Sequence, residues 1–285
     1  MTSGERATEI GGDVAGAEPR GGPRLVIVSS SPVTSLGPGR FALSQKFVTG
    51  VEAYQREWPG HIEVIAPPRD DVPGMDVLEA AAEDLPFRLA VQPVLAAAVE
   101  ESLRGAAMVL LMLGPEHVRL ASLCRALGVP CVFTTEYSLE TRRGIIASEV
   151  SHPLKRAAKM ALELVRERRA REAVAIPSGV QSNGTPTFEA YRGLNPETML
   201  FFDTRATEDM LATDAVIEKR AREQETSGVL RLAYTGRLVE MKGVSDLIEV
   251  ADLLRRDRPF TLSIYGDGHL KSSMEQEIQA RGLEG

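Results

Sequence analysis

Residues 234–243 read YTGRLVEMKG and residues 265–270 read YGDGHL. The first segment begins in an apolar run of strand length, Leu230 to Thr235, and the second in another, Phe260 to Tyr265. A helical pattern of apolar residues follows each of them. Two strand-loop-helix units in succession indicate a parallel α/β sheet. Because two parallel strands leave sheet edges and faces uncovered, we predict an incomplete domain at 229–285.

The loop from Gly236 to Gly243 has the chemistry of a phosphate site. Ligands of parallel α/β sheets bind beyond the carboxyl ends of the strands, where Arg237 leaves the first strand. Lys242 precedes the next helix, whose unpaired N–H groups carry a partial positive charge. Arg can grip two phosphate oxygens and Lys adds a mobile charge, so together they would neutralise a diphosphate without a metal. The same spacing also fits an alternative without a ligand, in which Arg237 and Lys242 are solvated loop charges and the glycines are ordinary turn residues.

The composition is that of a soluble globular protein. The 285 residues, 43% hydrophobic and 26% charged, can form about two α/β domains. A net charge of -7 argues against nucleic acid as a partner. The two cysteines, Cys124 and Cys131, have neither a disulfide-framework nor a zinc-ligand spacing, which favours a reducing cytoplasm. No apolar run reaches the length of a membrane span, and the N-terminus has no apolar signal core.

The rest of the chain reads as one further domain. The glycine-rich segment 1–23 is predicted to be a disordered tail, because it has too little apolar surface to offset the entropy of ordering. Apolar strands alternate with helices over 24–217, which predicts a first Rossmann-like domain, and the polar stretch 218–228 is predicted to be a linker. The predicted strands are 25–30, 62–66, 107–113, 129–134, 174–177 and 199–203, and two predicted helices are 41–58 and 116–127.

The carboxyl-terminal motifs carry a family resemblance. The run Gly236 to Val244, followed by Leu247-Ile248 and then by Leu262 to Gly268, resembles the second-domain signature of family 4 retaining glycosyltransferases. These group 1 type glycosyl transferases have the GT-B fold. The close resemblance begins at about Leu230, and the first domain is similar mainly in layout. The resemblance implies an α/β protein of GT-B architecture with two Rossmann-like domains, of which the second is incomplete here.

The resemblance also implies a donor site in the second domain. Arg237 and Lys242 would hold the diphosphate of a UDP- or GDP-linked sugar within the loop that Gly236 and Gly243 bound. The turn that follows the next strand would shape the donor pocket near the nucleotide; it consists of Gly266, Asp267 and Gly268. The resemblance implies no metal and no other cofactor.

A second glycine-containing loop matches the family layout in the first domain. The loop after the first strand faces the donor in the family, and its match is Leu36 to Arg40, where Gly37 and Gly39 would let backbone amides approach the ligand. A plain turn into a helix at Phe41 explains the same residues. The run also fits the dinucleotide pattern G-x-G-x-x-A, although six residues separate it from the strand and Pro38 removes an amide donor.

One carboxylate is a candidate catalytic residue. Family members commonly carry a His at the end of the strand that corresponds to 130–137, and Glu136 stands there in this chain. A carboxylate could accept a proton from the acceptor hydroxyl or hydrogen-bond the sugar, and it could equally be a surface residue of the next loop. The neighbouring Glu140, Arg142 and Arg143 either line the acceptor side or belong to a solvated loop.

The segment 154–171 is basic and amphipathic. It has a net charge of +5 and an apolar stripe of Leu154, Ala158, Leu162 and Val165. Because alanine-rich faces insert poorly into lipid, we predict that the stripe packs on the sheet. Peripheral contact with the anionic inner face of the membrane is the alternative.

Together these features predict sugar transfer with retention from a nucleotide-sugar to a hydroxyl of a glycan or glycolipid acceptor, in polysaccharide or glycolipid synthesis. Family members continue with further βα units, an acidic pair Glu-x7-Glu and a last helix that returns to the first domain, none of which follows Gly285 here. The alternative is a truncated, catalytically inactive protein that binds a nucleotide or a partner.

Overall fold

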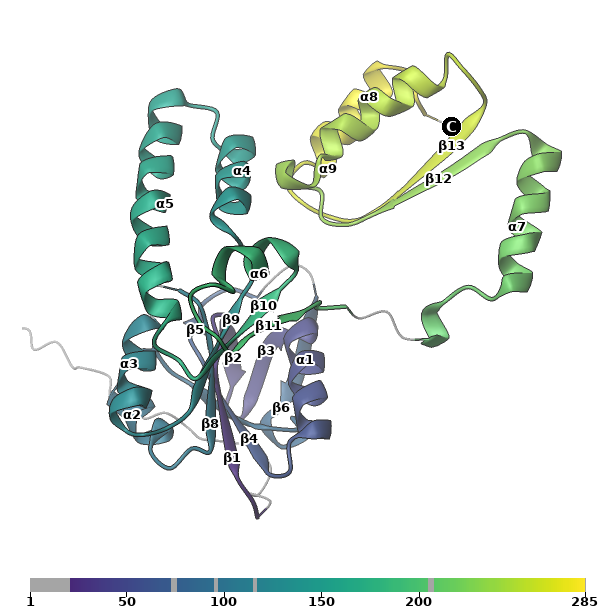
Figure 1. Ribbon diagram of the computed structural model, residues 1–285. Helices are drawn as coiled ribbons and strands as arrows, with labels where there is room; N and C mark the ends of the chain where they lie inside the picture. Colours follow the sequence, from purple (N-terminus) through teal and green to yellow (C-terminus); the bar gives the residue numbers. More distant parts are fainter. Residues whose placement is uncertain (1–20, 73–75, 95–96, 115–116, 205–207, 285) are drawn as a thin grey trace, which may run out of the picture. The chain divides into compact units, whose positions relative to one another are not determined.

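A computed structural model describes residues 21–72, 76–94, 97–114, 117–204 and 208–284 (Figure 1). All but the last three residues of the predicted tail, 1–23, lie outside these ranges. The chain divides into two compact units. Unit 1 contains the described residues up to Leu139 together with Leu164–Phe202, and unit 2 contains Glu140–Glu163 and the described residues from Asp203 onward.

Unit 1 is built on a seven-stranded parallel sheet of order β11-β10-β9-β8-β1-β4-β7. Parallel strands covered on both faces read as continuous apolar runs, which is why most of these strands were predicted from the sequence. The strands are β1 Arg24–Val28, β4 His61–Ala66, β7 Arg88–Val91, β8 Met108–Met112, β9 Cys131–Thr135, β10 Gly179–Asn183 and β11 Thr198–Phe201.

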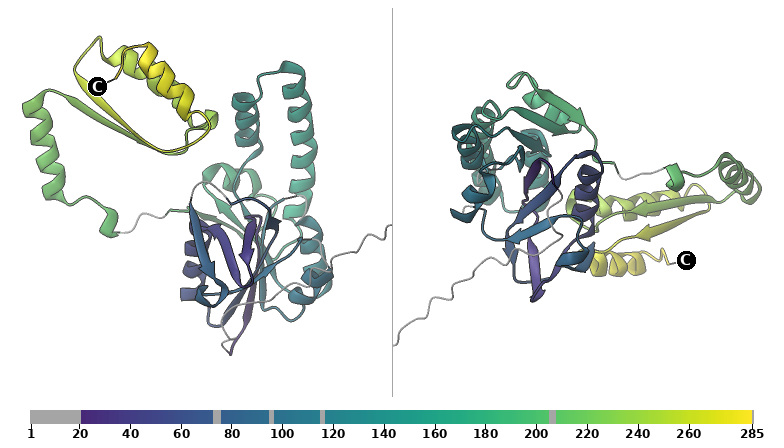
Figure 2. Two further views of the ribbon diagram at one scale, coloured as in Figure 1. Left: turned by 180° about the vertical axis from the view of Figure 1, so that it is seen from behind. Right: turned by 90° about the horizontal axis from the view of Figure 1, so that it is seen from below.

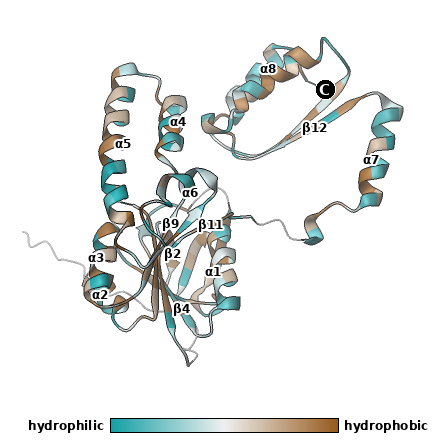
Figure 3. Cartoon of the chain, viewed as in Figure 1, coloured by the Kyte–Doolittle hydropathy of each residue, from teal (hydrophilic) through white to brown (hydrophobic). Residues whose placement is uncertain are grey.

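Helices bury apolar residues against both faces of this sheet. Helices α2 (Ala97–Leu103) and α3 (Val118–Ala126) and the end of α5 (Pro153–Val174) share one core cluster with the sheet. Helix α1 (Gln45–Glu57) belongs to the cluster on the other face, and α6 (Thr185–Tyr191) packs with β10 through the fully buried Tyr191. The strands at the centre of unit 1 are accordingly coloured as hydrophobic in Figure 3.

A four-stranded sheet of order β5-β2-β3-β6 was not predicted. Its strands are β2 Val33–Gly37, β3 Arg40–Ser44, β5 Pro68–Arg69 and β6 Val77–Ala81, which is followed by the 3₁₀ turn Ala82–Asp84. Strands β2 and β5 continue from β1 and β4, and the Val33 amide donates to the Pro67 carbonyl over 2.9 Å. The small sheet therefore extends the carboxyl edge of the large one. Prolines and the helix-like sequence VLEAA hide its strands from pattern analysis.

The structure corrects the predicted helix 41–58. Residues 41–44 belong to β3, and α1 begins at Gln45 because the Ser44 hydroxyl caps it by accepting the Phe47 amide over 3.2 Å. The G-x-G-x-x-A alternative is also wrong, since Gly37 and Gly39 turn the chain between two antiparallel strands rather than from a strand into a helix. Their φ angles of 136° and 66° explain why glycine occupies both positions.

The predicted strand 174–177 is wrong. Helix α5 continues to Val174 because Ala173 and Val174 are buried in the core, and the strand begins only at Gly179. Between them, the buried Asn195 amide donates to the carbonyls of Val174 and Pro177 over 3.0 and 3.1 Å. The mostly polar sequence of β10, GVQSN, gave no strand signal.

Unit 2 contains a two-stranded parallel sheet, β12 Leu230–Thr235 and β13 Phe260–Tyr265. Helices α8 (Val244–Leu254) and α9 (Lys271–Ala280) cover one face of it, as Figures 1 and 2 both show. Buried side chains of Leu238, Val244, Ile248 and Met274 form the core beneath them. The alternating residues of the opposite face are exposed along both strands. This is the incomplete α/β domain that the sequence predicts.

The polar stretch 218–228, predicted to be a linker, lies almost entirely within helix α7, Asp214–Ser227, which the 3₁₀ turn Glu208–Met210 precedes. All residues of α7 are exposed, and it carries ion pairs one turn apart, Arg222 with Glu218 and Lys219 with Glu223. Gly228, with a φ of 65°, ends it. A helix that is polar all round gives no apolar periodicity, so the sequence pattern could not reveal it. The predicted domain limits, 24–217 and 229–285, stay a prediction.

The first part of unit 2 is formed by α4 (Leu139–Glu149, from its second residue) and the beginning of α5. The stripe Leu154, Ala158, Leu162 and Val165 does not pack on the sheet as predicted, because all four side chains are exposed. Before the apolar end of α5, its buried side chains are those of Glu163 and Glu167. Within the described ranges, every helix is too short or too polar to cross a lipid bilayer.

Candidate functional site

The two glycine-containing loops of unit 2 are fastened to each other at the carboxyl ends of β12 and β13. The Gly236 amide donates to the Tyr265 carbonyl over 3.0 Å, and the Leu238 amide donates to the Asp267 carbonyl over 2.9 Å. The Leu270 amide donates back to the Leu238 carbonyl over 3.2 Å. The structure thus brings together the residues that the sequence selects in 236–243 and 266–268.

Close approach of the two loops explains two of the glycines. A Cβ atom on Gly266 would overlap the carbonyl oxygen of Gly236, and one on Gly268 would overlap the carbonyl group of Leu238. Between them, the Asp267 carboxylate accepts the Gly268 amide over 3.0 Å. The turn 266–268 is therefore required by packing within the protein itself.

Arg237 and Lys242 are exposed cations on this fastened frame. Leu238, only 4% exposed, follows Arg237 and is anchored in the core of unit 2. Lys242 ends the 3₁₀ turn Glu240–Lys242, and Gly243, with a φ of 65°, leads directly into α8. Within the described residues, neither cationic side chain has a hydrogen bond or an ion pair. Two exposed cations and a helix N-terminus thus lie at the ends of parallel strands, where anionic ligands commonly bind, and the phosphate site stays a prediction.

A side-chain pair also links the two loops. The His269 Nε2 atom lies 2.8 Å from a Glu240 carboxylate oxygen, which joins the first loop to the residue after the second. The hydrogen bond from His269 lowers the pKa of Glu240 below its ordinary value of 4.5. The paired carboxylate lies two residues before Lys242, in the 3₁₀ turn of the first loop.

We expect a carboxyl-resolved NMR titration to place the pKa of Glu240 below 4.5. His269→Ala should return it toward the ordinary value, since the hydrogen bond is its largest cause. Because the pKa of Glu240 is lower in the folded state than in the unfolded state, the pair stabilises the fold. This contribution to stability is complete above the pKa of the unfolded state and is lost as the pH falls through the pKa of the folded state. An unchanged Glu240 pKa in the variant would contradict the pairing.

The candidate residues of unit 1 lie on the carboxyl edge of its sheet. Glu136 directly follows β9 and is exposed, whereas Thr135 before it is buried and its hydroxyl donates to Ser182 over 3.3 Å. The hairpin with Gly37 and Gly39 belongs to the small sheet that extends the same edge. Turn geometry alone accounts for these two glycines, and their role toward a ligand stays a prediction.

The structure gives Arg142 a different role from either predicted one. Residues 139–149 form α4 rather than a loop. The Arg142 guanidinium pairs with the Glu163 carboxylate of α5 over 2.8 Å, and the Glu163 side chain is only 8% exposed. Arg142 thus fastens α4 to α5. Glu140 and Arg143 lie exposed on the same helix.

The strand order reveals one location that sequence reasoning missed. The chain runs from β1 outward to β4 and β7 and then returns to β8 on the other side of β1, so the topological switch point lies between β1 and β8. Ligands of doubly wound sheets bind beyond the strand ends at this point. The segment after β1, Ser29 to Ser31, lies there, and the Ser29 hydroxyl accepts the Ser31 amide over 2.9 Å. Strand order has no local sequence signal.

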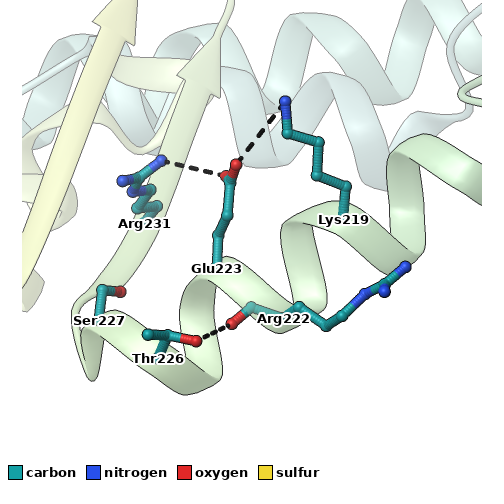
Figure 4. A pocket seen from close by; sticks show the side chains of 6 residues that line it. All are labelled: Lys219, Arg222, Glu223, Thr226, Ser227 and Arg231. Carbon is teal, nitrogen blue, oxygen red and sulfur yellow. Dashed lines mark hydrogen bonds and ion pairs between the residues drawn. The ribbon is translucent and has the colours of Figure 1, made fainter.

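A pocket of about 810 Å³ lies between α7 and β12 (Figure 4). Glu223 stands between Lys219 and Arg231 and pairs with them over 3.9 and 3.8 Å. Thr226, Ser227 and Arg222 complete its lining. Because Arg231 lies near the amino end of β12, this pocket is at the opposite end of the strand from the glycine loops. Because the basic side chains that line the pocket already form ion pairs with acidic side chains, we assign no ligand to the pocket.

The cysteines and the acidic and histidine side chains are the remaining candidates for reactive or metal-binding groups. Both cysteines, Cys124 and Cys131, are buried and reduced. The hydrogen bond to Cys131 and burial raise the pKa of the Cys124 thiol, which makes it a poor nucleophile. The described part of the chain contains no cluster of three His, Cys, Asp or Glu side chains that could hold a metal.

Comparison with known proteins gives a family match for one segment. Residues 216–285 match the model of the family described as Glycosyl transferases group 1. A comparison with curated protein sequences finds no match. The family match therefore covers the unit 2 sheet with both glycine loops.

Solved structures resemble nearly the whole chain. The Anabaena protein HepE in complex with UDP matches with a TM-score of 0.55 and 15% identity, over 92% of this chain and 66% of that one. Sucrose-phosphate synthase from Thermosynechococcus elongatus matches with a TM-score of 0.51 and 14% identity, over 92% and 68%. The apo form of the lipopolysaccharide outer core galactosyltransferase WaaB matches with a TM-score of 0.50 and 10% identity, over 92% and 66%.

At these identities the likeness establishes the fold. The chain spans about two thirds of the length of the structures that it matches. This agrees with a seven-stranded parallel sheet in unit 1 and a two-stranded one in unit 2. The predicted fold class is confirmed: the chain is an α/β protein of GT-B architecture whose second Rossmann-like domain is incomplete, and its segment 216–285 matches group 1 glycosyl transferases.

Proposed function

We propose that the protein is a family 4 retaining glycosyltransferase that moves a sugar from a nucleoside-diphosphate donor to an acceptor hydroxyl. The observation that carries the proposal is the pair of fastened loops in unit 2, which holds Arg237 and Lys242 exposed at the ends of β12 and β13. The group 1 glycosyl transferase match covers this segment. HepE, which has a similar fold, has been solved with UDP and with UDP-glucose.

The proposed roles follow from charge. The Arg237 fork and the Lys242 ammonium bind the diphosphate, and they stabilise the nucleoside diphosphate as it leaves with its extra negative charge. Backbone N–H groups of the α8 N-terminus add partial positive charge. Gly236, Gly243 and the turn 266–268 give the loops their shape, and we propose that the hairpin glycines Gly37 and Gly39 let the unit 1 backbone approach the donor.

The finer assignments are also proposals. UDP is the favoured nucleotide, with GDP as the other candidate, because the HepE complexes contain UDP and UDP-glucose. The acceptor is proposed to be a growing glycan or glycolipid in the cytoplasm, in line with the lipopolysaccharide role stated for the structural neighbour WaaB. Retention of the anomeric configuration is proposed from the family 4 resemblance of 236–268.

The test is a nucleotide-release assay with UDP- and GDP-linked sugars, followed by NMR of the glycoside product. We expect release of the nucleoside diphosphate and a product with the anomeric configuration of the donor. An inverted product would contradict the retaining assignment. Binding of the nucleoside diphosphate without any transfer would support the alternative of a catalytically inactive binding protein.

A separate prediction concerns Glu136. We propose that its carboxylate hydrogen-bonds the reacting sugar or the acceptor hydroxyl from the carboxyl end of β9. Glu136→Gln keeps a hydrogen-bonding group but removes the charge, so kcat should fall roughly fivefold to tenfold, as expected for the loss of about 1 kcal/mol. Steady-state kinetics will measure it, with the exposed Glu149→Gln as a control at the end of α4. A kcat equal to that of the control would remove Glu136 from the site.

A further inference from the structure

Helix α5 has its polar and apolar sides reversed relative to an ordinary surface helix. Over 153–168, three of the four residues that are not exposed are charged: Glu163 and Glu167 are buried, Arg156 is partly buried, and the partly buried Met160 is the apolar exception. Glu163 pairs with Arg142, Glu167 accepts the Tyr191 hydroxyl over 3.1 Å, and Arg156 donates to the Val150 carbonyl over 2.8 Å. Surface helices normally turn their apolar side inward. Here polar contacts hold the helix in place.

The outward side of α5 carries the apolar residues instead. Leu154 is 76% exposed, Leu162 is 48% exposed and Val165 is 51% exposed. Ala158 and Ala161 lie exposed between them, so the stripe is continuous over three turns of helix. Figure 3 shows hydrophobic and hydrophilic segments alternating along α5. The protein leaves this apolar stripe exposed to water and holds the helix through polar contacts on its other side. Such an exposed stripe indicates an external apolar partner.

The charges beside the stripe are positive. Lys155, Lys159 and Arg169 are exposed and have no ion pair within the described residues. Both acidic residues of 154–171, Glu163 and Glu167, are buried, whereas six of its seven bases are exposed. This contrasts with the net charge of -7 for the whole chain. The exposed charged side chains of 154–171 are therefore all positive.

We propose that the outward side of α5 docks on an anionic lipid bilayer, with the stripe at the level of the headgroups and the bases on the lipid phosphates. The apolar stripe matches the apolar interior of the bilayer, and the flanking bases match its anionic headgroups. A second copy of the helix would bring like charges together across a symmetric interface. The docking goes beyond the proposed sugar transfer and is independent of it.

Vesicle binding of the whole chain tests the proposal. The wild-type protein should co-sediment with vesicles of phosphatidylglycerol mixed into phosphatidylcholine and not with pure phosphatidylcholine. Binding should weaken when the salt is raised from about 0.1 M to about 1 M. The triple variant Lys155→Glu, Lys159→Glu and Arg169→Glu should lose about a hundredfold or more in partition coefficient, because each base near an anionic surface contributes severalfold.

Two further variants separate docking from a general charge effect. Arg56→Glu, Arg119→Glu and Arg125→Glu together change the net charge equally but replace exposed bases of α1 and α3, and this control should bind as the wild type does. Leu154→Ser with Val165→Ser keeps every charge and removes apolar surface from the stripe, so it should bind more weakly. Circular dichroism will check that each variant keeps its helices.

Three outcomes would overturn the proposal. The first is wild-type protein that does not bind anionic vesicles. The second is equal loss of binding in the α5 triple variant and in its charge-matched control, or undiminished binding by the stripe variant. The third is a dimer, seen by light scattering and abolished by Leu154→Ser with Val165→Ser, which would identify a second copy of the chain as the partner.

Discussion

Lys242→Ala and Arg237→Ala are each expected to weaken nucleoside-diphosphate binding by about 1.5 to 3 kcal/mol, which is roughly 10- to 150-fold in Kd. Each variant removes a cation that has no partner within the described part of the chain. The lost interaction is therefore the one with the ligand, with no internal ion pair broken. Calorimetric titration with UDP and with GDP will measure it.

The controls distinguish this site from a second group of basic residues in unit 2, at the other end of β12. Arg231→Ala removes an exposed arginine from the same strand, β12, but from the pocket beside α7, and it should leave Kd unchanged. Arg237→Lys should recover part of the affinity and not all of it, because a lysine cannot reproduce the two-oxygen grip of the guanidinium. Binding that is unaffected in both alanine variants would remove the diphosphate assignment.

Gly268→Ala and Gly266→Ala are each expected to destabilise the β12–β13 sheet by about 2 to 3 kcal/mol, in the upper part of the range for overpacking. The added Cβ would overlap backbone carbonyl groups of Leu238 or Gly236, which cannot move away as a flexible side chain can. The two loops would have to separate, breaking the hydrogen bonds between them. Both stability and diphosphate affinity should fall.

Hydrogen exchange of the β12 and β13 amides, read residue by residue, will measure the loss of local stability. Gly144→Ala is the matched control, since this glycine lies within α4 of the same unit and a Cβ there meets no atom. That substitution should be neutral or stabilising, because alanine favours the helix. Exchange in the Gly268→Ala variant that equals wild type would show that the loops are not tightly joined.

The sequence predicts those parts of the fold that depend on continuous apolar runs. Strands such as β4 and β8 are apolar nearly throughout and were found, as were the two βα units around Gly236 and Gly266. The unit 2 loops could be selected because glycines and cations at strand ends have a stated chemistry. The hydrogen bonds between the backbones of Leu238 and Asp267, which join the two loops, could not be predicted. Backbone hydrogen bonds form regardless of side-chain type and therefore leave no signal in the sequence.

The errors have a common physical origin in tertiary context. The sequence predicts the amphipathic pattern of α5, but such a pattern gives only the two sides of a helix. Which side faces the protein depends on contacts with distant residues, such as the pair of Glu163 with Arg142. The short strands β2, β5 and β6 form by pairing with one another at the edge of a larger sheet. Such pairing lies between distant residues, and no window of sequence contains it.

The fastened loops of unit 2 also determine what ligand binding has to order. Main-chain hydrogen bonds from Gly236, Leu238 and Leu270 already hold the loop backbones in one arrangement before any ligand arrives. Only the long side chains of Arg237 and Lys242 then lose rotamer freedom on binding, at about 0.5 to 1.5 kcal/mol each. A diphosphate would bind to loops whose backbone is already ordered. Most of its gross interaction energy would therefore appear as binding affinity.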